Sequence, residues 1–298
     1  MTTRTPDGSS EFDSLLPPLR VDRRGFMTTT LATGFALAAG QVQAQTAIKT
    51  DADGLTAGAV EIPVKGEKIP AYRAMPAGKQ NVPVVLVVSE IFGVHEYIQD
   101  VCRRLAKAGY MAIAPELFAR YGDATKYTDI PKLQAEIVSK VPDAQAMSDL
   151  DATAAWAATQ GGDPEKLAIT GFCWGGRIVW LYSAHNPKLK AGAAWYGRLK
   201  GSPDALKPDN PIDLVQKLNA PVIGAYGEKD AGISLADVDD MRNALKTGSA
   251  AAQASRIDLY GDAPHAFHAD YRPSYREAAA KQAWVRMLDW FAQKGVSA

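Results

Sequence analysis

The feature that most constrains the fold is an unbroken apolar run, Val84 to Val88. A strand with one face in water alternates apolar and polar side chains, whereas a strand covered by helices on both faces is apolar throughout. The run therefore predicts an inner strand of a parallel sheet that has helices on both sides.

Strand and helix patterns alternate along most of the chain. Two segments before the run, 59–64 and 69–74, are expected to be antiparallel strands. The strands expected after it are 110–114, 167–170, 191–196, 222–226 and 257–260, and the expected helices are 95–108, 143–159, 175–184 and 235–246. A final helix is expected from a capping box of Ser274 and Glu277, with one apolar face made of Ala280, Trp284, Met287, Leu288 and Phe291. This order predicts an α/β fold: a doubly wound, mostly parallel sheet with helices on both faces, whose ligands bind where the strands end.

The first 44 residues have the pattern of an export signal and not of a folded element. Arg23 and Arg24 precede an uncharged stretch that runs to Gly40, which is typical of a bacterial twin-arginine signal, and Val42 and Ala44 form a small-x-small cleavage pattern. A membrane anchor is the alternative, but the stretch is shorter than the ~20 apolar residues that span a bilayer. We therefore expect a periplasmic or secreted protein, with a single domain over 45–298.

The charge balance excludes some partners. Lys plus Arg and Asp plus Glu number 33 each in 298 residues, so no excess of positive charge indicates a nucleic-acid or membrane surface. We expect a monomer that acts on a small molecule, and nothing in the sequence implies an organic cofactor.

The two cysteines have different surroundings. Cys102 lies on the apolar face of the helix expected at 95–108, with Ile98, Val101 and Leu105, and is expected to be a buried thiol without a disulfide. Cys173 lies in the segment Thr-Gly-Phe-Cys-Trp-Gly-Gly at 170–176, between an expected strand and an expected helix. This is the G-x-nucleophile-x-G elbow with cysteine as the nucleophile. A glycine turn that holds an inert cysteine is the alternative; the glycines on both sides of the thiol favour the functional interpretation.

A cysteine nucleophile needs a base, because a thiol with a pKa of ~8.5 is only partly ionised at neutral pH. His265 follows the last expected strand, where enzymes with the order nucleophile, acid, histidine carry the base. His95 and His185 are expected to be surface or helix-edge residues. His268 could join His265 on a metal, but no further ligands complete such a site, so no metal is expected.

The orienting acid is expected in the loop after the strand at 222–226. Asp230 has the chain order and the loop position of a triad acid. A turn aspartate is the structural alternative, and Glu228 is a neighbouring competitor.

The chain resembles the dienelactone hydrolase family of the α/β-hydrolase superfamily. The resemblance is carried by the elbow, Asp230, His265 and Phe267, and by two further segments, Glu-Ile-Phe-Gly at 90–93 and Ala-Pro-Glu-Leu-Phe-Ala-Arg at 114–120. The likeness covers nearly all of the chain after residue 45. It implies an α/β-hydrolase fold and hydrolysis of a small carboxylic ester or lactone, of the carboxymethylenebutenolidase type, through an acyl thioester on Cys173. The resemblance also implies that Glu90 helps to take the thiol proton and that the backbone amides of Trp174 and Ile91 form an oxyanion hole. A carboxylate that caps the next helix is the alternative for Glu90.

One departure from the family concerns the substrate. Family members carry a carboxylate-binding arginine four residues after the histidine, but this chain has Ala269 there. Arg272 or Arg120 could supply the charge, and the other possible substrate contacts are Phe92, Trp195, Tyr196 and Phe267. A thioesterase or peptidase on the same fold, or a non-catalytic binding protein, are the other interpretations.

Overall fold

The computed structural model describes residues 47–298. The predicted export signal with Arg23 and Arg24, and the predicted cleavage near Gln45, lie outside the described residues.

Within 47–298, eight strands form one sheet in the order β1-β2-β4-β3-β5-β6-β7-β8. In chain order the strands are β1 (Leu55–Val64), β2 (Glu67–Pro76), β3 (Val82–Val88), β4 (Met111–Pro115), β5 (Gly162–Phe172), β6 (Ala191–Trp195), β7 (Val222–Gly227) and β8 (Arg256–Tyr260). The pairs β1–β2 and β2–β4 are antiparallel, and every pair from β4 to β8 is parallel.

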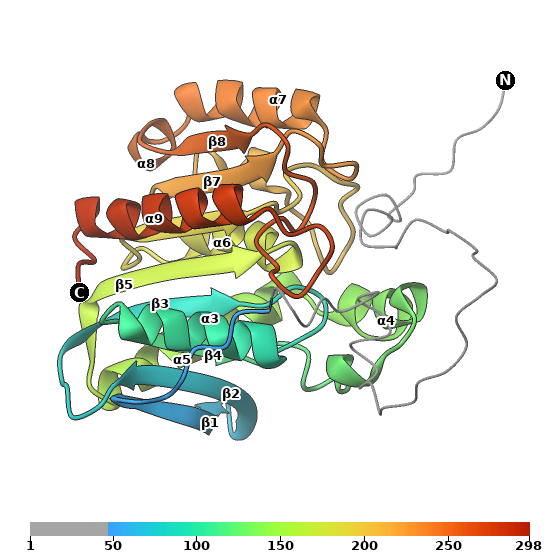
Figure 1. Cartoon of the computed structure of the whole chain (residues 1–298). Coiled ribbons are helices and arrows are strands. Elements are labelled where there is room, and N and C mark those ends of the chain that lie inside the picture. Colours follow the sequence, from blue (N-terminus) through green and yellow to red (C-terminus); the bar gives the residue numbers. More distant parts are fainter. Residues whose placement is uncertain (1–46) are drawn as a thin grey trace, which may run out of the picture.

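Helices cover both faces of the sheet. The helices are α3 (Glu96–Lys107), α4 (Ile130–Glu136), α5 (Asp143–Thr159), α6 (Trp174–His185), α7 (Leu235–Lys246), α8 (Ala250–Gln253) and α9 (Glu277–Gln293), with short 3-10 helices at Ala124–Lys126, Val138–Lys140 and Pro211–Leu214. Figure 1 shows α3 and α9 in front of the sheet and α5 and α6 behind it. Every residue of β3 is buried, as its apolar run predicts for a strand covered on both faces.

The predicted α/β architecture is confirmed, and every expected strand and helix is present. The helices expected at 143–159 and 235–246 are confirmed at both ends. The short helices α4 and α8 were not predicted, because so few residues hold no clear periodicity.

The capping box predicted for the last helix is wrong. The helix begins at Glu277, its N-cap is Arg276, and no side chain caps it. The Ser274 hydroxyl instead donates to the carbonyl of Ala266, 3.2 Å away. The Ser274 hydroxyl, which the local pattern predicted to cap the helix, is therefore used in a tertiary hydrogen bond instead.

Cys102 is fully buried in α3, as expected, and neither cysteine within residues 47–298 forms a disulfide. Burial raises the pKa of the Cys102 thiol far above its ordinary value, so this cysteine behaves as a core side chain. None of the helices in residues 47–298 combines the length and hydrophobicity that crossing a bilayer requires.

Candidate active site

Cys173 occupies a strained turn at the carboxyl end of the sheet. It lies between the last residue of β5 and the first residue of α6, with φ 53° and ψ −114°. A positive φ is unfavourable for a residue with a side chain, and such strain concentrates at functional sites. The Cys173 amide donates to the carbonyl of Trp195, 3.0 Å away, which fixes the turn against the end of β6.

Close backbone packing explains the glycines of the elbow. A Cβ on Gly171 would lie 2.4 Å from the carbonyl oxygen of Gly175, and a Cβ on Gly175 would lie 2.3 Å from that of Val88. Both neighbours are backbone atoms that cannot move aside. Glycine is therefore required where β3, β5 and α6 meet.

Asp230 and His265 form a buried pair contributed by the loops after β7 and β8. His265 Nδ1 lies 2.7 Å from Asp230 Oδ2, and both side chains are 1% exposed. A carboxylate can only accept, so Nδ1 carries the proton and Nε2 of the neutral ring is left as an acceptor. The competitor Glu228 is exposed and makes no bond to the histidine. The tertiary structure thus pairs His265 with Asp230.

Tyr196 joins the thiol side of the site to the histidine side. Its ring centroid lies 5.1 Å from that of His265, and burial together with the charges of Glu90 and Cys173 raises the pKa of its hydroxyl well above the ordinary value. The loop that carries His265, drawn in orange to red in Figure 1, passes the end of the sheet to which the parallel strands point. Cys173 and His265 therefore lie at the same edge of the sheet, and both act on or contact Tyr196.

Nε2 of His265 is buried and makes no hydrogen bond to a described residue. It is an imidazole nitrogen with a lone pair and no partner to compete for it, which is the state that a general base needs before substrate binds.

Glu90, in the loop after β3, is buried and bonded through one oxygen. His95 Nε2 lies 3.0 Å from Oε1, and the Tyr271 hydroxyl donates to the same oxygen over 2.9 Å. Oε2 has no hydrogen-bond partner among residues 47–298. Burial by itself raises the pKa of Glu90, but the attraction and hydrogen bond of His95, with the bond from Tyr271, outweigh it and lower the pKa below its ordinary value. The next helix, α3, has no side-chain cap, so Glu90 does not cap it.

Of the two places expected for His95, the surface or a helix edge, the structure shows the helix edge. His95 is the N-cap of α3, but it is 6% exposed and turned toward Glu90. The loop at 89–95 folds back over the end of the sheet, and this brings a residue that begins a helix into the interior.

The two amides expected to form an oxyanion hole are available. Trp174 is the first residue of α6, where the helix offers its amide no earlier carbonyl. Ile91 lies in the loop after β3 and is fully buried. Neither amide donates to another described residue. Buried amides without partners are suited to bind a developing negative oxygen.

Three of the possible substrate contacts lie around Tyr196 and Glu90. The guanidinium of Arg272 lies over the Phe92 ring at 5.9 Å, and its charge acts on the hydroxyl of Tyr196. Phe267 is fully buried against Tyr196, with ring centroids 5.4 Å apart.

Two other expected substrate contacts point elsewhere. Arg120 binds Asp149 and Glu67 at 2.7 and 2.9 Å, so its charge is used in a structural ion-pair network. The indole of Trp195 donates to Thr170 Oγ1 at 3.0 Å, within the core. Trp195 contacts the elbow through its backbone carbonyl, which accepts the Cys173 amide.

His268 is part of the core beside the site. The Tyr97 hydroxyl is hydrogen-bonded to its Nδ1 at 2.6 Å, and the ring stacks on Trp284. Burial and the nearby Arg104 lower the pKa of His268 well below its ordinary value. Among residues 47–298, no three His, Cys, Asp or Glu side chains are grouped in a way that could hold a metal ion.

The sequence did not identify Tyr271 and Tyr97, which line the buried end of the site next to Glu90 and Tyr196. Their hydroxyls bond to residues far away along the chain, Tyr271 to Glu90 and Tyr97 to His268. A tyrosine in a loop or on an apolar helix face gives no local signal of such a contact.

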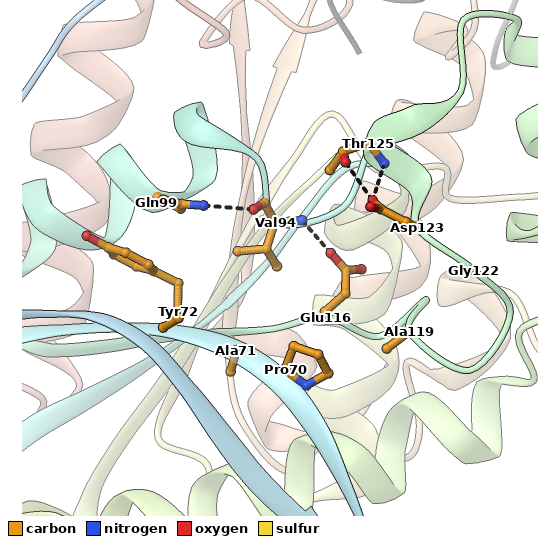
Figure 2. A pocket seen from close by; sticks show the side chains of 11 residues that line it. Pro70, Ala71, Tyr72, Val94, Gln99, Glu116, Ala119, Gly122, Asp123 and Thr125 are labelled. Carbon is orange, nitrogen blue, oxygen red and sulfur yellow. Dashed lines mark hydrogen bonds between the residues drawn. The ribbon is translucent and has the colours of Figure 1, made fainter. Parts of the chain in front are cut away.

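A cavity of about 490 Å³ lies behind the loop that carries Glu90 and Ile91. Figure 2 shows Glu116 on its wall, accepting the amide of Val94 at 2.7 Å. Burial raises the pKa of Glu116. None of Cys173, Asp230 and His265 lines this cavity, so it is separate from the thiol and the histidine, and Glu116 supports the back of the loop.

Residues 69–295 match the Dienelactone hydrolase family. The chain belongs to this family. It is a hydrolase of the dienelactone hydrolase type.

Its relatives are similar over almost their whole length. The chain is 56% identical over 289 residues to a Methylorubrum extorquens protein named “Putative carboxymethylenebutenolidase”, with 97% of this chain and 98% of that protein covered. An Escherichia coli K12 protein of the same name is 52% identical over 270 residues, which cover 90% of this chain and 98% of that protein.

Solved structures give the same result for the fold. The crystal structure titled “Putative Dienelactone Hydrolase”, from Klebsiella pneumoniae, has a TM-score of 0.78 and 57% identity and covers 80% of this chain and 99% of its own. An esterase of Pyrobaculum calidifontis, with a TM-score of 0.58 and 18% identity, covers 81% of this chain and 87% of its own, and this likeness concerns the α/β-hydrolase fold alone.

Proposed function

We propose that this protein hydrolyses a small carboxylic ester or lactone through an acyl thioester on Cys173, with His265 as the base and Asp230 as the residue that orients it. The observation that carries the proposal is the buried 2.7 Å Asp230–His265 pair beside a cysteine held at positive φ. A strained nucleophile turn and an oriented imidazole are the two components that acyl transfer needs.

The first half-reaction forms the acyl-enzyme. His265 Nε2 takes the thiol proton as Cys173 Sγ bonds to the substrate carbonyl carbon, and the carbonyl electron pair moves to oxygen. The amides of Trp174 and Ile91 stabilise this oxyanion. When it collapses, the carbon–oxygen bond to the leaving group breaks and the imidazolium returns its proton to the leaving alkoxide.

The second half-reaction restores the enzyme. His265 takes a proton from water as the water oxygen bonds to the thioester carbon, and collapse of the new oxyanion breaks the carbon–sulfur bond. The products are the free acid and the Cys173 thiol. A lactone gives one hydroxy-acid product because its leaving group stays attached.

The substrate is proposed to carry a carboxylate, as the relatives' name carboxymethylenebutenolidase implies for them. The positive group that supports this proposal is Arg272, which is 6% exposed and lies over Phe92. Arg272 would take the place of the carboxylate-binding arginine, since this chain has Ala269 at that position. A guanidinium matches a carboxylate in geometry and charge.

The test is a panel of p-nitrophenyl acetate, dienelactone and a small thioester, with and without iodoacetamide. We expect hydrolysis of esters and lactones that iodoacetamide abolishes, and loss of turnover in Cys173→Ala with an unchanged thermal unfolding midpoint. Cys102→Ala is the matched control, because this thiol is buried in α3 away from the site. Full activity in Cys173→Ala would refute the proposal.

We also propose export to the periplasm or the medium through the twin-arginine motif at Arg23 and Arg24. The proposal is supported by the uncharged stretch after the two arginines and by the cleavage pattern that ends at Ala44.

A further inference from the structure

We propose that His95 and Tyr271 are positioning residues that keep Glu90 ionised in the interior and leave its second oxygen as a proton acceptor in the site. This inference rests on the proposed function, since it assigns Glu90 to the reaction of Cys173.

The two carboxylate oxygens of Glu90 have different surroundings. Oε1 accepts from His95 and from Tyr271, at 3.0 and 2.9 Å. Oε2 is buried and has no hydrogen-bond partner in the described part of the chain. A carboxylate oxygen that is removed from water and left without a donor is costly. Such an atom persists where a substrate hydroxyl or the nucleophile supplies the proton during the reaction.

Position connects this oxygen with the thiol. Glu90 follows Ser89, whose carbonyl lies 2.6 Å from where a Cβ of Gly175 would be, so the loop after β3 packs directly on the elbow. The charges of Glu90 and Cys173 both act on the hydroxyl of Tyr196. The carboxylate and the thiol therefore border the same aromatic side chain.

The charged and titratable groups around Glu90 come from four elements. They are His95 and Tyr97 at the start of α3, Cys173 at the elbow, Tyr196 after β6, and Tyr271 with Arg272 in the loop before α9. The pKa of each of the three tyrosine hydroxyls is raised well above its ordinary value, mainly by burial, so they stay protonated. The Tyr271 hydroxyl donates its proton to Glu90. His95 is the basic group in direct contact with the carboxylate, and its ring nitrogen must donate because an ionised carboxylate only accepts.

The consequence is a defined proton transfer. Glu90 assists His265 in the first half-reaction: Oε2 accepts the thiol proton of Cys173 as substrate binds, the sulfur keeps the electron pair, and the proton then passes to His265 Nε2. His95 retains its own proton in the bond to Oε1. If the donors on Oε1 were lost, Glu90 would be protonated at higher pH and could no longer accept. The role of His95 is therefore visible as a pH dependence, which a purely structural role would not produce.

The test compares His95→Gln with the wild type. Glutamine keeps a hydrogen-bond donor but cannot carry a charge. The carboxyl carbon of Glu90 is followed by NMR in protein labelled with ¹³C-glutamate, with Glu90→Gln to identify its signal. We expect the midpoint of Glu90 to rise by about one to two pH units, as the loss of a charge-assisted bond implies. The ratio of kcat/KM in the variant to that in the wild type is then expected to fall as the pH is lowered from 8 to 5, by about tenfold at most for each unit by which the Glu90 midpoint has risen.

Two further variants make the test specific. His185→Gln is the matched control, because His185 also binds a carboxylate, Asp151 at 2.7 Å, but is exposed at the end of α6. Its activity ratio should not vary with pH. In a Glu90→Gln background, His95→Gln should add no further pH dependence, because the group on which it acts is gone. If His95→Gln does not fold, Tyr271→Phe removes the other donor and should shift the Glu90 midpoint in the same direction by a smaller amount.

An unchanged Glu90 midpoint in both His95→Gln and Tyr271→Phe would overturn the inference, as would a flat activity ratio in an active His95→Gln enzyme. Failure of the proposed function has a different signature. In that case Cys173→Ala would keep its hydrolytic activity, while the NMR titration would still report whether His95 holds Glu90 ionised.

Discussion

Replacement of Asp230 by asparagine tests whether Asp230 orients His265, because it exchanges one carboxylate oxygen for an NH₂ group. Asp230 Oδ1 accepts the amides of Gly232 and Ile233 at 2.8 and 3.1 Å, and Oδ2 accepts His265 Nδ1 at 2.7 Å. An asparagine would keep its oxygen on the side of the two amides, because its NH₂ group cannot accept from them. The NH₂ group would then face His265.

That arrangement inverts the tautomer of the histidine. Nδ1 must become the acceptor, so the proton moves to Nε2, and Nε2 can no longer take a proton from the thiol. Where a triad aspartate is changed in this way, the loss is about 10³–10⁴-fold in rate, or about 4–5.5 kcal/mol of transition-state stabilisation. We expect kcat/KM for p-nitrophenyl acetate to fall by this amount in Asp230→Asn.

The assay is steady-state hydrolysis at pH 7.5, with thermal unfolding to show that the variant is folded. Glu228→Gln is the matched control, because it removes an exposed carboxylate from the same loop and should have activity close to the wild type. If folded Asp230→Asn keeps more than about a tenth of the wild-type kcat/KM, the tautomer argument is wrong.

Three other predictions follow from the structure and the sequence. Gly175→Ala places a Cβ 2.3 Å from a backbone carbonyl of β3, and we expect a loss of about 1–3 kcal/mol of unfolding free energy in urea titrations; unchanged stability would contradict the packing of the elbow. The pKa of Glu90 is lowered from 4.5, so its charge stabilises the folded state fully above that pH and less as the pH falls through the folded value. The difference in urea midpoint between wild type and Glu90→Gln should therefore shrink below about pH 4.5, and a constant difference would count against an ionised Glu90. Lysine at both Arg23 and Arg24 should keep the protein in the cytoplasm, which fractionation and immunoblotting would detect, and normal export of this double variant would disprove the twin-arginine assignment.

Part of the site could be predicted because its signals are local. The elbow is a continuous segment, and the glycine pattern around Cys173 carries its own steric reason. His265 could be chosen by chain order, since in a parallel sheet each strand ends at the same edge and the loops after β5, β7 and β8 must meet there. The same reasoning could not decide whether Asp230 or Glu228 is the acid that orients His265. Both lie in one loop, and the sequence does not show which side chain points toward the histidine.

The sequence by itself determined the α/β architecture, the element order and the turn that holds the thiol, because the apolar run of β3, the helix periodicities and the glycines act over a few residues. Only the tertiary structure decided which polar groups share a partner. Tyr271 reaches Glu90 from 181 positions away, Arg120 is taken up by Asp149 and Glu67, and Ser274 leaves the helix it was expected to cap. These contacts depend on how loops meet after the sheet has formed, and a buried carboxylate binds whichever donors the fold brings to it.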